Sequence, residues 1–391
     1  MQFKPLKIQP KDFSSRAYYP GTVGNPFHKI DQIQNIVQLV PPPIYAIIFG
    51  LIAQLILMNI QKSLSLAAFI LLDWIILSSL PILKISFGPA HLTTLVLGTL
   101  RFPFMFLNFP VFLLFELIGT FLVIYSFMIE PQLIKLEKYE IPIYRLEQIS
   151  EDIRLIHLSD LHMEYITKRE KRAIKNINDL SPDLILFTGD FINTSFQNDT
   201  RSYSDINNFF NQLNARYGIF VVSGSPSVDL KLSTQSVLTE SNIVFIDDQC
   251  KVIEINQFKL GLIGLSCSHQ PQNDYSRLKE LIQSTDFETD FNILLYHSPD
   301  ISPLLNDLPI DLQIAGHTHG GQVKIPFVGP IYTSSLYGLK FSSGAYLVNG
   351  KTKLIISRGI GLEGQAAPRV RFLSPPEIGL ITLESNKSNV K

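Results

Sequence analysis

Residues 312 to 322 read LQIAGHTHGGQ: a short, mostly apolar run ends at a glycine, and a turn with two histidines and two glycines follows. Short apolar runs bounded by glycine are typical of buried strands. His317 and His319 lie in the turn, where glycines leave the backbone free to bring both imidazoles to one place. Neutral imidazole is a common ligand of borderline divalent metals. The stretch therefore predicts a metal-binding turn at the carboxyl end of a strand.

Three other predicted strands, 153–158, 184–188 and 293–296, also end in residue types that bind metals. Loops at the carboxyl ends of strands in an α/β sheet meet at one crevice. A mixed set of carboxylates and imidazoles favours Mn, Fe or Zn over Ca or Mg alone. Each motif alone is more often a turn or a cap, but together they predict a metal site. The candidate ligands at these strand ends are Asp160, His162, Asp190 and His297.

The order of the motifs, D-x-H, G-D, H and then G-H-T-H, resembles the calcineurin-like metallophosphoesterase superfamily. The GGQ after GHTH and the distal SRGIG, PRVRF and PPEIGLITL look like its membrane-tethered, YkuE-like bacterial branch. The match covers roughly residues 130–385. It implies an α/β fold, a β-sandwich of two mixed sheets flanked by helices, with the metal loops along one edge.

The resemblance also implies two divalent metal ions and a role for each candidate ligand. Two such ions activate a shared water and clamp the phosphoryl oxygens of an in-line displacement. In the family pattern, Asp160, His162 and His319 would bind the first metal, Asp190 would bridge both, and His297 and His317 would bind the second.

Residues 221–230, VVSGSPSVDL, depart from the family pattern, which carries G-N-H-[DE] here. Ser225 aligns with the Asn that binds the second metal, and its hydroxyl is a weak neutral ligand, so its metal role is doubtful. Pro226 aligns with the His that donates a proton or stabilises the leaving oxygen, and proline has no ionisable group. Ser227 aligns with the acidic residue that orients that His. General acid catalysis typically raises the rate by ~10²–10⁴-fold. Because Pro226 cannot act as this acid, no catalytic residue is assigned.

Two residues are candidate substitutes for what this loop lacks. His269, in LSCSHQP after another predicted strand, is a weak candidate for the acid, and the plainer interpretation is a surface-loop histidine. Asp229 could likewise reach the site as a replacement ligand.

The motifs leave two functions open. The first is a membrane-anchored, metal-dependent phosphohydrolase that uses a two-metal-activated water on a phosphate mono- or diester, with a lipid-linked substrate as one option. The second is a catalytically impaired pseudoenzyme that binds metal or a phosphorylated ligand as a scaffold or sensor. The formal net charge of -1 indicates no nucleic-acid binding patch. The oligomeric state is not predicted.

Apolar residues are concentrated in the first third of the chain, and the mean hydropathy is +0.19. Residues 43–60 carry no charge, and 64–83 and 111–129 carry one acidic residue each, Asp73 and Glu116. These stretches have about the length of a membrane span. The acidic residues are either functional or, more plainly, satisfied between packed helices. The stretch 85–110 is either a fourth span or a re-entrant or interfacial segment.

The number of spans decides which side the C-terminal domain occupies. Four spans give the stronger positive-inside asymmetry and place this domain in the cytoplasm. Three spans give a weak bias and the opposite side. Either arrangement predicts a multi-pass integral membrane protein, with a bacterial plasma membrane as the expected location.

The sequence thus predicts four segments: a polar arm (1–42), a transmembrane region with three or four helices (43–130), a metallophosphoesterase domain (131–385) and a disordered tail (386–391). Residues 132–150 alternate like a half-buried strand. Further strands are expected at 153–158, 184–188, 219–223, 243–246, 260–265, 293–296, 312–315 and 354–357. Helices are expected at 168–179, 204–213 and 274–284.

Overall fold

The computed structural model describes residues 2–22, 24, 27–143, 151–229, 238–285, 288–364 and 367–385. The chain divides into two compact units, and each is described by itself. The sheet unit comprises Met1–Asn25, Ile134–Leu362 and Leu373–Lys391, and the helical unit comprises Pro26–Leu133 and Glu363–Phe372. The expected disordered tail, 386–391, and the end of the expected strand at 132–150 lie outside the described residues.

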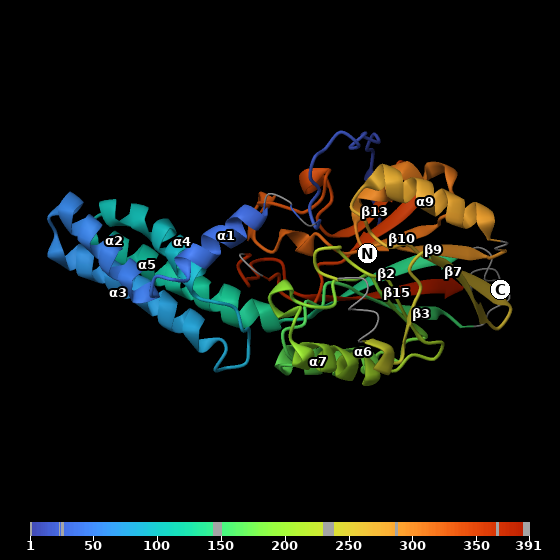
Figure 1. The fold of residues 1–391 in the computed structure, drawn as a ribbon, viewed down its shortest axis with the longest axis horizontal. Helices are drawn as coiled ribbons and strands as arrows, with labels where there is room; N and C mark the ends of the chain where they lie inside the picture. Colours follow the sequence, from blue (N-terminus) through green and yellow to red (C-terminus); the bar gives the residue numbers. More distant parts are fainter. Residues whose placement is uncertain are drawn as a thin grey trace, which may run out of the picture. The chain divides into compact units, whose positions relative to one another are not determined.

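Two mixed sheets form the sheet unit (Figure 1). The seven-stranded sheet has the order β1 (Lys4–Leu6), β13 (Gly344–Val348), β14 (Thr352–Ile356), β10 (Leu312–Ala315), β9 (Phe291–Leu295), β8 (Phe258–Gly264) and β7 (Gln249–Ile255). The six-stranded sheet has the order β2 (Lys135–Ile143), β15 (Glu377–Ser385), β3 (Ile153–Leu158), β4 (Leu184–Phe187), β5 (Ile219–Val221) and β6 (Ile243–Phe245). A separate hairpin pairs β11 (Lys324–Ile325) with β12 (Gly329–Pro330).

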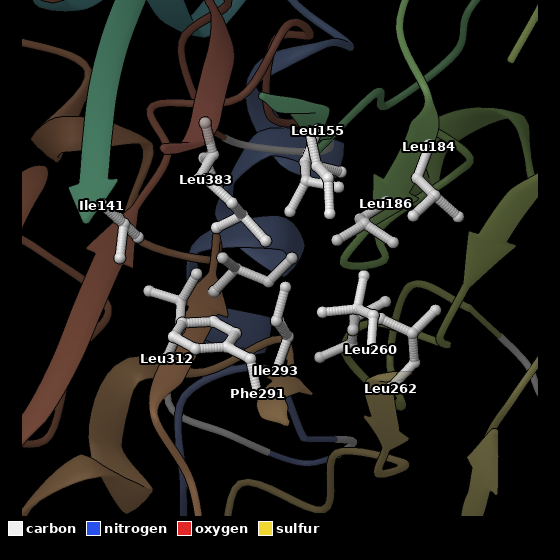
Figure 2. Packing of buried hydrophobic residues seen from close by; sticks show 14 of the residues in the cluster. Ile141, Leu155, Leu184, Leu186, Leu260, Leu262, Phe291, Ile293, Leu312 and Leu383 are labelled. Atoms are coloured by element: carbon white, nitrogen blue, oxygen red, sulfur yellow. The ribbon is translucent and has the colours of Figure 1, made fainter. Parts of the chain in front are cut away.

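The main hydrophobic core lies between the two sheets, and Figure 2 shows side chains from both meeting there. Side chains alternate between the faces of a strand. On β9, Ile293 and Leu295 join this inner core, whereas Leu294 joins a second core on the outer face. The predicted β-sandwich of two mixed sheets is therefore confirmed.

Helices cover the outer faces of both sheets (Figure 1). The helices α6 (Lys168–Asp179) and α7 (Thr200–Asn211) pack on the six-stranded sheet, and α9 (Pro271–Ser284) and the 3₁₀ helix η7 (Pro299–Asp307) pack on the other. Thr167 and Glu170 form a capping box that begins α6 where the sequence predicts it. The helix α7 begins four residues earlier than expected because Asp199 caps Arg201 N.

The first 22 residues belong to the sheet unit rather than to a separate polar arm. Strand β1 pairs in parallel with β13, with Pro5 opposite Leu347. Ile8, Phe13 and Tyr19 are buried on the outer face of the seven-stranded sheet. These apolar residues are spaced too irregularly to show a helical or strand period, so the local pattern does not predict this packing.

The helical unit contains α1 (Phe27–Val37), α2 (Pro42–Leu57), α3 (Ile60–Ser79), α4 (His91–Arg101), the 3₁₀ turn η1 (Phe102–Phe106) and α5 (Phe109–Ile124). A π-helical turn, η2 (Tyr125–Ile129), and a 3₁₀ turn, η3 (Glu130–Gln132), extend α5. Two helices of the described chain, Ile60–Ser79 and Phe109–Gln132, are long and apolar enough to cross a membrane.

The expected first and fourth spans are shorter. The helix α2 has 16 residues, and α4 has 11, or about 16 Å, which is roughly half of a hydrocarbon core. The expectation of three or four continuous spans is thus reduced to two candidates in the described residues.

Asp73 and Glu116 pair with one arginine inside the helical unit. Arg101 Nε lies 2.6 Å from Asp73 Oδ2, and a terminal nitrogen of Arg101 lies 2.6 Å from Glu116 Oε2. All three side chains are buried. This agrees with the plainer interpretation, in which both acidic residues are satisfied between packed helices. Removal of one partner from such a trio leaves a buried charge unpaired.

Candidate metal centre

Two parallel strand pairs, one in each sheet, bring the four sequence motifs to the same edge of the sandwich. Strands β3 and β4 pair in parallel and run into the D-x-H and G-D motifs, and β9 and β10 pair in parallel and run into His297 and the G-H-T-H motif. All six expected ligands are buried and close together: Asp160, His162, Asp190, His297, His317 and His319.

One group of possible ligands consists of Asp160, His162 and His319. His162 Nε2 lies 3.1 Å from His319 Nε2, and the latter lies 3.5 Å from Asp160 Oδ1. Two ring nitrogens at this distance must share a proton or a cation, because two facing lone pairs repel each other. The arrangement suits a metal ion held by one carboxylate and two imidazoles.

A second group of possible ligands surrounds His297. Its Nδ1 lies 2.7 Å from the Thr188 carbonyl oxygen and donates to it, which turns Nε2 toward Asp190 Oδ2 at 3.2 Å. Such a hydrogen bond fixes the ring orientation of a metal-binding histidine. His317 Nε2 is buried and has no hydrogen-bond partner among the described residues. That unsatisfied acceptor fits a site for a cation.

The buried ionisable groups of the site shift one another's pKa values. Burial lowers the pKa of His297, but the carboxylate of Asp190 outweighs it and raises this pKa to about 9. Burial opposes ionisation of Asp190, yet His297 and then His162 hold the pKa of Asp190 far below its usual range. Burial, followed by the charge of His297, lowers the pKa of His317 to about 3. In the metal-free protein the proton on His297 therefore balances Asp190, and a bound cation would displace it.

Five of the expected ligands adopt left-handed backbone conformations, with φ between 38° and 69°: Asp160, His162, Asp190, His317 and His319. Residues with a Cβ rarely adopt this region, although Asp and His do so more often than most. Such conformations cluster at functional sites, where the surrounding structure compensates for the strain. Here they turn successive side chains of each loop into one centre.

The GSPS loop keeps the backbone of the site. Ser225 N donates to Asp190 Oδ1 at 2.6 Å, and Ser225 Oγ lies 3.2 Å from His297 Nε2. A Cβ on Gly224 would overlap the backbone nitrogen and Oδ1 of Asp190, so only glycine fits there. Pro226 is half-buried and offers no proton. The doubtful ligand Ser225 thus lies in the centre, but the acid–base chemistry of the family loop is missing.

His269 lies in the centre, and the plainer interpretation of it as a surface-loop histidine is wrong. The residue is only 2% exposed, and its Nε2 lies 3.0 Å from Ser225 Oγ. Burial, followed by the charges of His317 and His297, lowers its pKa well below the usual value. The only sequence signal was its place after a predicted strand.

Asp229 holds two loops together instead of joining the ligand groups. Its carboxylate accepts hydrogen bonds from the backbone N–H groups of Asp190 at 2.8 Å, Phe191 at 3.0 Å and Gly224 at 2.8 Å. Both oxygens are therefore engaged by the G-D and GSPS loops. Its role is to position Asp190.

The SRGIG segment, noted in the sequence only as a resemblance, supports the D-x-H turn. Ile360 N donates to the Ser159 carbonyl oxygen at 3.2 Å, and Gly361 N donates to the Asp160 carbonyl oxygen at 2.7 Å. Arg358 pairs with Glu137 on β2 and Glu377 on β15, which fixes this segment to the six-stranded sheet. Sequence reasoning could not assign this role because the contacts span about 200 residues.

Comparisons of the sequence with known families and proteins find metallophosphoesterases. The family model described as calcineurin-like phosphoesterase matches residues 153–321. The uncharacterized metallophosphoesterase YkuE of Bacillus subtilis is 30% identical over 271 residues, which cover 67% of this chain and 89% of that protein. The UDP-2,3-diacylglucosamine pyrophosphatase LpxG of Chlamydia muridarum is 26% identical over 302 residues, which cover 64% and 89%. Among solved structures, GAP50 of Plasmodium, described as the anchor in the inner membrane complex, overlaps with a TM-score of 0.37 at 14% identity, over 61% of this chain and 86% of that one.

The role of Asp229 predicts a large effect from a small change. We expect Asp229→Asn to lower the free energy of unfolding by about 2–3 kcal/mol, because the amide nitrogen cannot accept from the backbone N–H groups that face it. Thermal unfolding of the full chain in detergent measures the loss, and hydrogen exchange should quicken at Asp190 and Gly224. Asp205→Asn is the matched control, because Asp205 accepts one backbone N–H, from Ile166 at 2.9 Å. Equal effects of both variants would contradict this role.

Proposed function

Since the chain belongs to the calcineurin-like metallophosphoesterase superfamily, in its YkuE-like bacterial branch, we propose that it hydrolyses a phosphate mono- or diester with the help of two divalent metal ions. Mn, Fe and Zn are the proposed metals, because the ligand set mixes carboxylates and imidazoles. Asp160, His162, Asp190 and His319 would hold one ion. Asp190, His297 and His317 would hold the other.

One carboxylate oxygen carries this proposal. Asp190 Oδ2 lies 3.6 Å from His162 Nε2, in the first ligand group, and 3.2 Å from His297 Nε2, in the second. An oxygen that faces both groups at these distances would serve as their shared ligand. This supports two adjoining cation positions beside one carboxylate, the arrangement expected of a two-metal hydrolase.

When bound, two divalent ions lower the pKa of a coordinated water and offset the negative charge of the phosphoryl oxygens. The chain itself supplies the anionic, buried ligand set and the fixed backbone of the GSPS loop. Pro226 supplies no proton to the leaving group. The site therefore suits a substrate whose leaving group is stable without protonation. A phosphate leaving group, as in a pyrophosphate bond, meets this condition, because its second pKa is about 6.

A lipid-linked substrate fits two further observations. LpxG, similar to this chain over 64% of its length, is named as a pyrophosphatase of a diacylglucosamine nucleotide. The chain also carries two helices of sufficient length and apolarity to cross a bilayer. We extend the proposal to a membrane-attached enzyme that acts on a phosphate or pyrophosphate ester at the membrane surface.

The fold constrains how the chain crosses the membrane in this proposal. Strand β1 (Lys4–Leu6) lies in the same sheet as strands from the far end of the chain, so residues before and after the helical segment occupy one side. The number of crossings must therefore be even, and the three-span alternative would separate β1 from β13. The basic residues Lys4, Lys7, Lys11, Lys135 and Lys138 all lie on this side. By the positive-inside rule, we propose that this side is the cytoplasm.

A hydrolysis assay tests the proposed function. We expect the metal-free full chain to hydrolyse an activated aryl phosphodiester only after Mn²⁺ is added, and a chelator to abolish the activity. Asp190→Asn should lower kcat/KM by at least about 100-fold, since even residues behind a ligand cost 10–100-fold. Asp179→Asn, in an exposed ion pair on α6, is the control that should keep the wild-type rate. Equal rates with and without metal would contradict a metal-dependent enzyme.

The pseudoenzyme remains a second candidate because of Pro226. Restoring the family loop with Ser225→Asn and Pro226→His should raise the rate on an alkyl phosphodiester by ~10²–10⁴-fold, the usual contribution of a general acid. The rate on the aryl ester should change little, because its leaving group needs no proton. Turnover that is absent in the metal-loaded wild type on both esters and appears only in the double variant would favour the pseudoenzyme.

Membrane attachment and sidedness can be tested on native membranes. We expect the full chain to stay in the membrane pellet after an alkaline carbonate wash, because the apolar surfaces of α3 and α5 are stabilised by lipid. Added protease should digest the sheet unit in inside-out vesicles and leave it intact in sealed right-side-out vesicles. Release by carbonate would contradict the attachment, and the reverse protease pattern would contradict the cytoplasmic side.

A further inference from the structure

The centre contains a buried histidine that the family pattern does not include. His269 follows β8, and its Nε2 lies 3.0 Å from Ser225 Oγ. Its ring centroid lies 4.3 Å from that of His317 and 5.9 Å from that of His297. One ring nitrogen of each of these three histidines lies within 4.8 Å of the others. Three buried imidazoles thus meet where the family has two imidazoles and an asparagine.

The backbone of His269 resembles that of the expected ligands. Its φ is 60°, within the left-handed range of Asp160, Asp190 and His317. As in the other motifs, the conformation turns a side chain that follows a strand into the centre.

Neighbouring residues fix the turn that carries His269. Ser268 N and Ser268 Oγ donate to the carboxylate of Asp274, at 3.0 and 2.7 Å, in the first turn of α9. Asp274 also pairs with Arg277 at 2.9 Å. Hydrogen bonds behind a ligand that hold it in place are typical of metal sites.

The N-terminal residues close the outer side of His269. The Gly21 carbonyl oxygen accepts from Ser227 N at 3.2 Å and from Ser227 Oγ at 2.9 Å. Gly21 has a φ of 76°, and a Cβ there would overlap His269 Nε2. The chain therefore passes over the imidazole so closely that only glycine fits. His269 is buried here, and its Nε2 lies beside both Gly21 and Ser225 Oγ.

We infer that His269 Nε2 is a protein ligand of the second divalent metal, in place of the asparagine that the GSPS loop lacks. This inference rests on the proposed two-metal function. An imidazole binds borderline divalent metals better than a neutral hydroxyl does. Ser225 Oγ lies 3.0 Å from His269 Nε2 and 3.2 Å from His297 Nε2, so both nitrogens face one point, and a bound ion would take the place of these two hydrogen bonds. The ligand lost from one loop is supplied by another loop at the same edge.

Metal stoichiometry and affinity test this assignment without relying on turnover. The metal-free full chain in detergent is loaded with Co²⁺ or Mn²⁺, and bound metal per chain is counted by elemental analysis after gel filtration. The visible spectrum of Co²⁺ reports on coordination. The wild type should hold two ions, and His269→Ala should hold one under the same conditions. The Kd of the second ion should rise by at least about tenfold.

A rescue variant separates a ligand from a packing residue. Ser225→Asn in the His269→Ala background should restore the second ion, because it returns an amide oxygen to the family position. His91→Ala, which changes a histidine in the helical unit, is the control and should hold two ions.

The outcomes distinguish this inference from the proposed function. Two ions in His269→Ala with an unchanged Kd and an unchanged Co²⁺ spectrum would overturn the assignment of His269 and leave the two-metal function standing. Loss of both ions from a folded His269→Ala chain without rescue by Ser225→Asn would also overturn it. A wild type that binds no metal would overturn the proposed function itself.

Discussion

The charge of the Asp190 carboxylate is the constraint on which the rest of the centre depends. A buried carboxylate is stable only when hydrogen bonds and positive charge surround it. Here Ser225 N donates to one of its oxygens at 2.6 Å, and His297 lies 3.2 Å from the other. Asp160, a second buried carboxylate, stands among the same histidines. Two buried carboxylates and several imidazoles form a ligand set that suits divalent cations, which would supply more positive charge than one proton on His297.

The GSPS loop shows which parts of a catalytic loop the fold needs and which parts only the chemistry needs. Gly224 and the backbone of Ser225 remain because they contact Asp190 directly, and Asp229 ties both loops together. The side chains at 225 and 226 can change without loss of these contacts. In the proposed enzyme, the absence of an acid at Pro226 would limit the substrates to those with stable leaving groups, and His269 would replace the missing metal ligand. Within the four residues of the GSPS loop, the backbone contacts that hold Asp190 are therefore independent of the side chains that would take part in catalysis.

The sequence predicts the centre better than it predicts its surroundings. Motifs at strand ends are local, and parallel pairing of β3 with β4 and of β9 with β10 carries them to one edge, so the six expected ligands are found together. The pairing of β1 with β13 joins residues more than 300 positions apart, and three strand residues show no period. The supports from Asp229 and the SRGIG segment likewise act across loops.

The sequence predicts three or four membrane spans, and the described residues contain two candidates. The difference arises because a local pattern does not show where each helix ends. Hydropathy records composition but not where a helix ends. Asn59 caps the start of α3, and Met58, in a left-handed conformation, ends α2 after 16 residues. The pairing of β1 with β13 joins residues from before and after the helical segment in one sheet, which hydropathy does not record.

The most direct test of the two-metal centre is an anomalous diffraction map from crystals of the full chain grown with Mn²⁺ and measured near the manganese absorption edge. We predict two separate peaks, one beside Asp160, His162 and His319 and the other beside His297 and His317, with the Asp190 carboxylate between them. A single peak, or none in crystals whose side chains are otherwise ordered, would contradict the account.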